Sequence, residues 1–204
     1  MKYSIVLLAF IIIPQIALGQ TCLHKNLSKE FNFEVKIRKI KNSKEEIDSN
    51  AVKIIIYNKI TNKKQELNFG ASYLFQKTFI ECTKSVRSYS TGINKDAEIV
   101  DNDFGDIIIA DFNFDNREDF AIKNDSGGNG GPTYNFYIQD ANKNFKLDKF
   151  LTKEMAFFPS KIVAKNKRLV TYVHANAYQL SENTFEYNEP LKKWNYKASK
   201  LVTP

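Results

Sequence analysis

Hydrophobic and polar positions alternate with a period of two along most of the chain. Alternate residues from Phe31 to Ile37 are apolar, so they would lie on one face of a half-buried strand. Residues 51–57 and 64–69 flank a polar turn, as the two arms of a β-hairpin do. Short apolar or alternating segments continue toward the C-terminus and predict strands over 106–111, 120–122, 133–139, 161–163, 168–175, 184–187, 191–196 and 200–202.

Many short strands separated by turn signals are typical of β-sandwiches and barrels. We therefore predict an all-β chain: a single-domain antiparallel β-sandwich or barrel-like fold with at most one or two short helices. The best helix candidate is the segment 149–157, which is short. No internal repeat and no linker divides the chain, so a second domain is not expected.

The first nineteen residues have the features of a secretory signal peptide. Lys2 provides a positive start, and residues 5–13 are an unbroken apolar run. The segment 17–19 has small residues at its first and last positions, as a signal-peptide cleavage site does. The run is too short to span a bilayer, and we expect no membrane span in the mature chain. The mature protein would be one calcium-binding β domain over 20–204, exported to the periplasm or the extracellular space.

Export gives the two cysteines a possible structural role. In an oxidising compartment Cys22 and Cys82 can form a disulfide. Closing a loop of that size would stabilise the fold by about 4 kcal/mol in the chain-entropy model. Two alternatives stay open: the cysteines are unrelated thiols, or Cys22 is lipidated, although Thr21 is a poor match for the small residue that precedes a lipidated cysteine.

Charge adds little evidence for a polyanionic partner. The 204 residues carry 30 Lys and Arg against 23 Asp and Glu, a formal net charge of +7. The basic run over 36–44 is followed at once by Glu45, Glu46 and Asp48, which is typical of a solvated face rather than of a nucleic-acid groove. We expect no nucleic-acid partner.

The strongest chemical signal is the acidic segment 111–119. Side chains with oxygen atoms occupy its positions 1, 3, 5 and 9, namely Asp111, Asn113, Asp115 and Asp119. Ca²⁺ prefers six to eight oxygen ligands, and the backbone carbonyl of Arg117 at position 7 would add one. The spacing predicts a calcium site, with further ligands from water, Asp106 or Asp125. The alternative is an acidic turn that holds no metal.

The rest of this segment indicates how it would be held. Phe112 and Phe114 would face the core, and Asn116 lies where such loops need an unusual backbone angle, which Asn tolerates. The segment is not an EF-hand, because position 12 is Ile122 rather than glutamate and the flanks are strand-like.

A second signal is the glycine-rich segment from Ser126 to Tyr134. It contains four glycines but lacks the Gly-Lys-Ser/Thr of a phosphate loop, and a strand follows it. It is either a flexible connector or a surface where backbone approaches a partner closely.

The sequence offers few catalytic motifs. His24 and His174 are the only histidines, and no nucleophile elbow is present. We therefore expect a protein without enzymatic activity, although a glycosidase-like carboxylate pair stays open by residue count.

The acidic segment, the glycine-rich loop and the aromatic segment 134–145 together resemble a family of exported bacterial calcium-loop proteins. Members of that family are secretion-system immunity proteins that protect against cell-wall-cleaving toxins, and they resemble periplasmic inhibitors of invertebrate-type lysozyme. The acidic segment alone is also similar to the calcium loops of FG-GAP and VCBS repeats. Lysozyme inhibitors of this kind use a Ser-Gly-x-x-Tyr element, for which Ser126, Gly127 and Tyr134 are the nearest equivalents.

The resemblance implies an exported, calcium-stabilised β-protein that binds and inhibits a cell-wall hydrolase. Its partner would be a peptidoglycan hydrolase, contacted through the loop from Ser126 to Tyr134. The alternative is a secreted or surface module that binds a glycan or an adhesion ligand with a single FG-GAP-like calcium loop. A glycosidase with two acids in a cleft is the third hypothesis.

Overall fold

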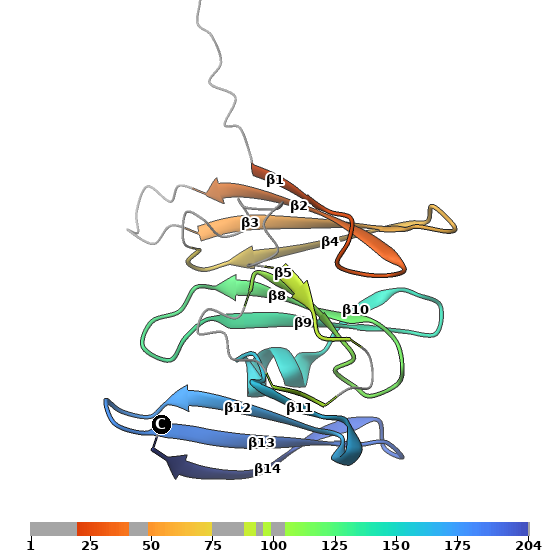
Figure 1. Cartoon of the computed structure of the whole chain (residues 1–204). Coiled ribbons are helices and arrows are strands. Elements are labelled where there is room, and N and C mark those ends of the chain that lie inside the picture. The colour runs from red at the N-terminus through yellow and green to blue at the C-terminus, as the bar shows by residue number, and fades with distance from the viewer. Residues whose placement is uncertain (1–19, 41–48, 75–87, 93–95, 99–104, 204) are drawn as a thin grey trace, which may run out of the picture.

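The computed structural model describes residues 20–40, 49–74, 88–92, 96–98 and 105–203. The described residues form three β-sheets stacked one above another, as Figure 1 shows. The expected signal peptide, residues 1–19, lies outside the described residues, as does Cys82.

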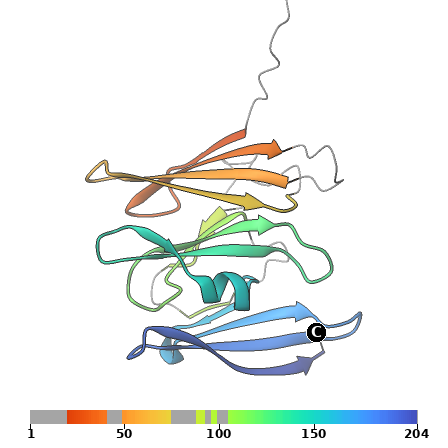
Figure 2. The same cartoon turned by 180° about the vertical axis from the view of Figure 1, so that it is seen from behind.

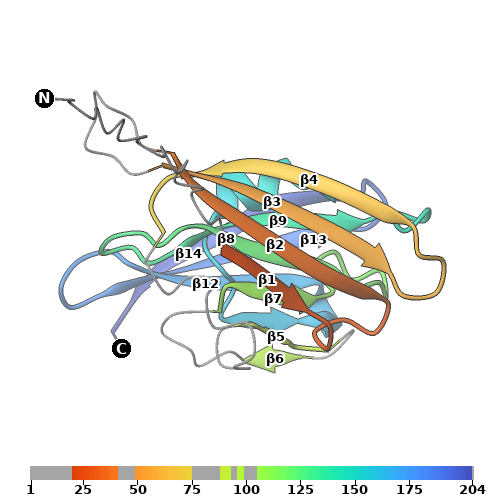
Figure 3. The same ribbon diagram turned by 90° about the horizontal axis from the view of Figure 1, so that it is seen from above.

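The first sheet contains the N-terminal strands in sequence order, each antiparallel to its neighbour. They are β1 (Gln20–His24), β2 (Phe31–Ile40), β3 (Ser49–Asn58) and β4 (Lys64–Ala71). The alternation predicted for β2 is confirmed, because Phe31, Phe33, Val35 and Ile37 are buried while their neighbours are not. The predicted hairpin is β3 and β4. Figure 3 looks down onto this sheet, whose strands cross over those of the sheets beneath.

The middle sheet has the order β10-β9-β8-β7-β5. Its strands are β5 (Ser88–Ser90), β7 (Ile107–Ala110), β8 (Asp119–Asp125), β9 (Thr133–Gln139) and β10 (Phe145–Leu147). All pairs are antiparallel except β5 with β7, which is parallel. A register shift between Lys123 and Asp125 bends β8 as it approaches the glycine-rich loop.

The third sheet has the order β14-β13-β12-β11-β6, with antiparallel neighbours throughout. Its strands are β6 (Ala97–Glu98), β11 (Lys161–Val163), β12 (Arg168–His174), β13 (Leu180–Asn188) and β14 (Lys193–Val202). The segments 191–196 and 200–202 were predicted as two strands; residues 193–196 and 200–202 belong to the single strand β14, and residues 191–192 lie in the turn before it. A polar, mostly exposed stretch hides this continuity in the sequence, because pairing with β13 rather than burial defines the strand.

The described helical structure is small, as predicted. A single turn, η1 (Leu151–Met155), lies within the predicted segment 149–157, and η2 (Ala164–Asn166) is one 3₁₀ turn. Among the described residues, no helix has the length and apolar character needed to cross a bilayer. The all-β, single-domain prediction is confirmed.

The middle sheet is buried on both faces, and this divides the core in two. Ile107, Ile109 and Phe120 pack against the first sheet, whereas Ile108 and Phe136 pack against the third sheet and η1. Strands that alternate between two buried faces are apolar throughout, which explains the continuous apolar run of β7. Figure 2 shows from behind that η1 fills the space between the middle and third sheets.

The direction of β8 places the two sequence signals at opposite ends of the middle sheet. The acidic segment precedes β8, which begins at Asp119, and the glycine-rich segment follows its end at Asp125. At about 3.3 Å per residue, the strand separates the two loops by roughly 20 Å. Figures 1 and 2 show the two loops projecting in opposite directions. The two signals are neighbours in sequence but not in space.

Candidate functional site

The acidic loop, residues 111–119, closes on its own backbone amides. The two carboxylate oxygens of Asp111 accept hydrogen bonds from the N–H groups of Asp115 at 2.9 Å and Asn116 at 2.8 Å. Asp119 Oδ2 accepts from Phe112 N–H at 2.9 Å, and its Oδ1 accepts from Gln139 N–H at 2.8 Å on β9. The first and last acids of the predicted calcium pattern therefore fix the loop to itself and to the middle sheet.

The central acid of the loop is bonded by side chains. Asp115 Oδ2 accepts from Asn113 Nδ2 at 2.7 Å and from the Arg117 guanidinium, while Asp115 Oδ1 accepts from Arg117 N–H at 3.0 Å. Arg117 Nε also donates to the carbonyl of Gln139 at 3.1 Å. The Arg117 side chain is thus committed to the loop and to β9, a role that the sequence did not predict.

The loop backbone needs two left-handed residues. Asn116 has φ of 70°, as predicted, and Phe114 has φ of 60°, which was not predicted and is uncommon for a bulky side chain. The Phe114 ring packs on Trp194 of β14 with a centroid distance of 6.0 Å. Phe112 is fully buried and packs edge-on against Phe136 at 5.1 Å. The prediction that both phenylalanines anchor the loop in the core is confirmed.

The carboxylates of the loop lie close enough to affect one another. Burial raises the pKa of Asp119 well above its usual range, and the nearby Asp115 and Asp111 carboxylates add to the rise. Burial also raises the pKa of Asp111, again with a contribution from Asp115. Hydrogen bonds from the backbone oppose both shifts.

One oxygen of the loop favours an additional ligand. Asn113 Oδ1 is buried and has no hydrogen-bond partner, and a buried acceptor without a partner is costly. Within the described residues, however, no group of three or more Asp, Glu, His or Cys side chains is placed to hold a metal ion. The predicted ligand set of Asp111, Asn113, Asp115, Arg117 and Asp119 therefore shares one loop, but its acids are turned toward N–H donors.

Asp106 and Asp125 do not supply further ligands to this loop. Both lie at the opposite end of the middle sheet. Asp106 Oδ1 is 3.5 Å from the ammonium of the fully buried Lys123, and Asp125 Oδ1 accepts from Gly127 N–H at 2.6 Å. The hypothesis that they complete the calcium site is wrong, because β7 and β8 carry them away from it.

A pocket lies between the acidic loop and the β13–β14 turn. The pocket of about 290 Å³ is lined by Asn113, Asp115 and Arg117 on one side and by residues of the β13–β14 turn on the other. The residues on that side are Tyr187 near the end of β13 and Glu189 and Lys192 in the turn. Both walls carry charges of both signs, so the loop end of the molecule is strongly polar.

Glu118 connects the acidic loop to the first sheet. Its buried carboxylate accepts from the Ser28 hydroxyl, from Lys29 N–H at 2.9 Å and from Glu30 N–H at 3.3 Å. Ser28 lies in the turn between β1 and β2, 90 positions earlier in the chain. No local pattern could have predicted this contact, since it depends on the stacking of two sheets.

The glycine-rich loop closes into a tight turn. Gly127 has φ of +69°, and a Cβ atom there would lie 1.9 Å from the carbonyl oxygen of Gly131. Gly131 N–H donates to the carbonyl of Gly128 at 3.0 Å. A Cβ atom on Gly130 would touch the Phe157 ring at 3.4 Å and Val173 at 3.8 Å. The glycines allow the backbone to close on itself and to pack against the third sheet.

Two of the residues predicted to contact a partner, Ser126 and Tyr134, are buried beneath this loop. Tyr134 is fully buried, and its hydroxyl donates to the carbonyl of Gly105 at 2.8 Å. Ser126 is also buried, and its N–H donates to the carbonyl of Tyr73. Neither side chain is presented at the surface, because both support the loop from below. The exposed positions at its tip are Gly128 and Asn129.

The predicted disulfide stays a prediction. Cys22 is buried on β1, with its Sγ 3.1 Å from His24 Nε2, and the described residues include no free cysteine. Its predicted partner Cys82 lies outside the described residues.

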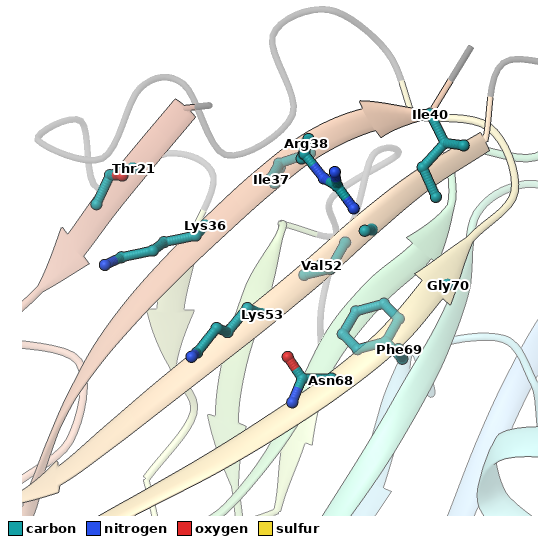
Figure 4. Close-up of a pocket in the computed structure, with 11 residues that line it drawn as sticks. Thr21, Lys36, Ile37, Arg38, Ile40, Val52, Lys53, Asn68, Phe69 and Gly70 are labelled. Atoms are coloured by element: carbon teal, nitrogen blue, oxygen red, sulfur yellow. The ribbon is translucent and has the colours of Figure 1, made fainter. Parts of the chain in front are cut away.

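The outer face of the first sheet carries a broad, shallow groove of about 720 Å³. Figure 4 shows its lining, in which Lys36, Arg38 and Lys53 gather on β2 and β3 beside Asn68 and Gly70 of β4. Lys36 pairs with Glu34 at 2.9 Å and Lys53 with Glu66 at 2.6 Å. The groove is basic and open, and its described lining contains no carboxylate and no histidine.

Comparison with known proteins supports the fold. No protein-family model matches the chain, and no curated protein matches it in sequence. A solved structure described as a Xanthomonas type IV secretion system related protein shares its fold, with a TM-score of 0.57 and 15% sequence identity. The alignment covers 93% of this chain and 95% of that one. The likeness extends over nearly the whole molecule, so the three-sheet architecture is shared with a secretion-system-related protein.

Proposed function

We propose that this chain is an exported protein without catalytic activity that binds and inhibits a cell-wall hydrolase. The contact would be made by the glycine-rich loop. The observation that carries this proposal is the closure of the loop on itself through Gly127 and Gly131. A loop that is rigid before binding loses little conformational entropy when it enters a partner, which favours tight binding.

The fold and the order of the sequence signals support the same function. The shared architecture is that of a solved structure described as a type IV secretion system related protein. The N-terminal pattern predicts export to the compartment where a peptidoglycan hydrolase acts. A protein partner of this class would meet the loop tip at Gly128 and Asn129 rather than at the buried Ser126 and Tyr134.

The decisive experiment is a turbidity assay on bacterial cell walls with the mature chain, residues 20–204. The enzymes are purified c-type, g-type and invertebrate-type lysozymes, a bacterial muramidase and a bacterial lytic transglycosylase. We expect inhibition of at least one enzyme. No inhibition of any of them, together with binding to purified glycan strands, would favour the glycan-binding module instead.

Two matched variants locate the contact. A Cβ atom at Gly128 or at Gly70 would meet no heavy atom within 4 Å outside its chain neighbours, and both positions are exposed, so we expect Gly128→Lys and Gly70→Lys to fold equally well. Gly128→Lys places a charged side chain on the loop tip, whereas Gly70→Lys places one on the outer face of the first sheet. We expect inhibition to be lost only in Gly128→Lys. Equal inhibition by both variants would remove the loop from the contact.

We also propose that the acidic loop holds Ca²⁺ through Asp111, Asn113, Asp115 and Asp119, with the backbone carbonyl of Arg117. The unpartnered Asn113 Oδ1 supports this assignment. The cation would offset the mutual repulsion of the loop carboxylates, so its role would be structural. Ca²⁺ at 100 times its dissociation constant should stabilise the fold by about 2.7 kcal/mol. A melting curve that is the same in EDTA and in excess Ca²⁺ would refute the assignment.

A further inference from the structure

The β12–β13 hairpin lies beside the glycine-rich loop. Val173, near the end of β12, is one of the two side chains that a Cβ on Gly130 would touch. Beyond His174, the last residue of β12, the chain turns through residues 175–179 and returns as β13. Figures 1 and 2 show this hairpin and the β8–β9 loop projecting side by side from the same end of the molecule.

The tip of this hairpin presents an aromatic side chain on a turn that is closed by hydrogen bonds. Tyr178 is 81% exposed. Its N–H donates to Asn176 Oδ1 at 2.9 Å, and Asn176 Nδ2 donates to Gln179 Oε1 at 3.0 Å. Ala175 N–H donates to the carbonyl of Gln179 at 3.0 Å. A single exposed tyrosine needs no explanation, but one at a hydrogen-bonded hairpin tip beside a second closed loop is placed for contact.

The two neighbouring segments share an unusual composition. Charged residues make up 26% of the chain, yet none occurs in 126–134 or in 169–181. The exposed residues of these segments are Gly, Asn, Ala, His and Tyr. Binding loops of antibodies favour Tyr, Ser, Gly and Asn, because Tyr offers a large amphipathic area at low entropic cost and the small residues adapt their hydrogen bonds. Interface centres are likewise depleted of charge.

We propose that the β12–β13 hairpin, with Tyr178 at its tip, forms one partner-binding surface with Gly128 and Asn129. Its occupant is the substrate cleft of a glycan-cleaving hydrolase, an inference that rests on the proposed function. Such a cleft is concave and contains a pair of carboxylates that accept hydrogen bonds. The Tyr178 hydroxyl and the Asn129 amide are donors on a protruding surface that carries no carboxylate of its own.

The test uses the same turbidity assay, on the enzyme that the wild-type chain inhibits. Tyr178→Ala should weaken inhibition at least 30-fold, as removal of an interface anchor does. The control is Ile60→Ala, which removes a 79% exposed apolar side chain in the β3–β4 turn at the opposite end of the molecule. This control should inhibit like the wild type. Because both side chains are exposed, the melting temperatures of both variants should stay unchanged.

Two substitutions of opposite charge at Ala177 test the chemistry of the occupant. Ala177 is exposed beside Tyr178. Ala177→Asp would bring a carboxylate toward the cleft acids and should weaken inhibition at least 10-fold, whereas Ala177→Lys should be tolerated. The reverse order would overturn the assignment of a carboxylate-lined cleft.

The outcomes separate this inference from the proposed function. Full inhibition by Tyr178→Ala, with loss in Gly128→Lys, would overturn the role of the hairpin and leave the inhibitor function standing. Absence of inhibition by the wild-type chain against every enzyme tested would overturn both. Loss in Tyr178→Ala with full activity of Ile60→Ala supports the shared surface.

Discussion

The two ends of the middle sheet carry loops of opposite character. At one end the acidic loop, the β13–β14 turn and the β3–β4 turn are rich in charged side chains, and the acidic loop is held by buried aromatic rings and by Glu118. At the other end the glycine-rich loop, residues 126–134, and the tip of the β12–β13 hairpin, within residues 169–181, carry no charged side chain and are held by local hydrogen bonds. The anchored acidic loop and the proposed recognition surface thus lie at opposite ends of the fold.

The separation also limits what a cation could do. A Ca²⁺ ion in the acidic loop would lie at the beginning of β8 and the glycine-rich loop at its end, so the ion could not contact the recognition surface. Its effect would reach that surface only through the stability of the middle sheet. We therefore expect chelation to change the melting temperature much more than the strength of inhibition at low temperature.

The largest expected effect is at the charged end. Phe112→Ala removes a fully buried ring that packs against Phe136 and Phe158. We expect a loss of about 3–5 kcal/mol in the free energy of unfolding, because the truncation leaves a cavity. Urea denaturation measures this loss. Leu191→Ala, an exposed position in the β13–β14 turn, should change the stability by less than about 0.5 kcal/mol. Similar values for both would show that the loop is not anchored by the core.

The second-largest loss of stability is expected at the contact between the first and middle sheets. Glu118→Gln keeps the size of the side chain but removes the carboxylate that accepts from Ser28, Lys29 and Glu30. Hydrogen bonds to charged groups are worth about 1.5–3 kcal/mol, so we expect a loss of about 2–3 kcal/mol. Glu189→Gln is the matched surface control, and hydrogen exchange of the amides of Lys29 and Glu30 should rise only in Glu118→Gln.

At the end of the molecule that carries the glycine-rich loop, a single added methyl group should change the stability. Gly127→Ala forces a side chain into a left-handed position and against the Gly131 carbonyl, so we expect a cost of about 1–2 kcal/mol and a displaced loop. Gly128→Ala adds the same methyl group where no atom lies within 4 Å and should be neutral. Thermal unfolding compares the two. An equal response would mean that the loop is not closed as described.

The smallest effect is a pH dependence from the first sheet. Burial lowers the pKa of His24 below its usual value of 6.5, which Asp106 partly opposes. The unfolded chain therefore takes up a proton at a higher pH than the folded one, and stability falls as the pH drops below about 6.5. Melting temperatures at pH about 7.5 and about 5.5 should differ in the wild type and differ less in His24→Gln. An unchanged difference would assign the dependence to other groups.

Sequence patterns predicted most strands because burial on one face imposes a period of two. The exceptions have physical causes. β14 is almost entirely exposed, so its hydrophobic pattern is interrupted although its hydrogen bonds to β13 are continuous. The two loops lie where the sequence signals placed them, but the burial of Ser126 and Tyr134 was not foreseen, since a pattern of residue types does not show which side chains the neighbouring sheet will cover.

The amino-acid sequence by itself determined the β-rich class, the closing glycines and the acidic spacing from Asp111 to Asp119, because each depends on residues close together in the chain. Only the tertiary structure decided that these loops face opposite ways, that Glu118 reaches Ser28, and that the β12–β13 hairpin lies beside the glycine-rich loop. Those relations depend on how three sheets stack, and stacking is set by contacts between residues far apart in the sequence.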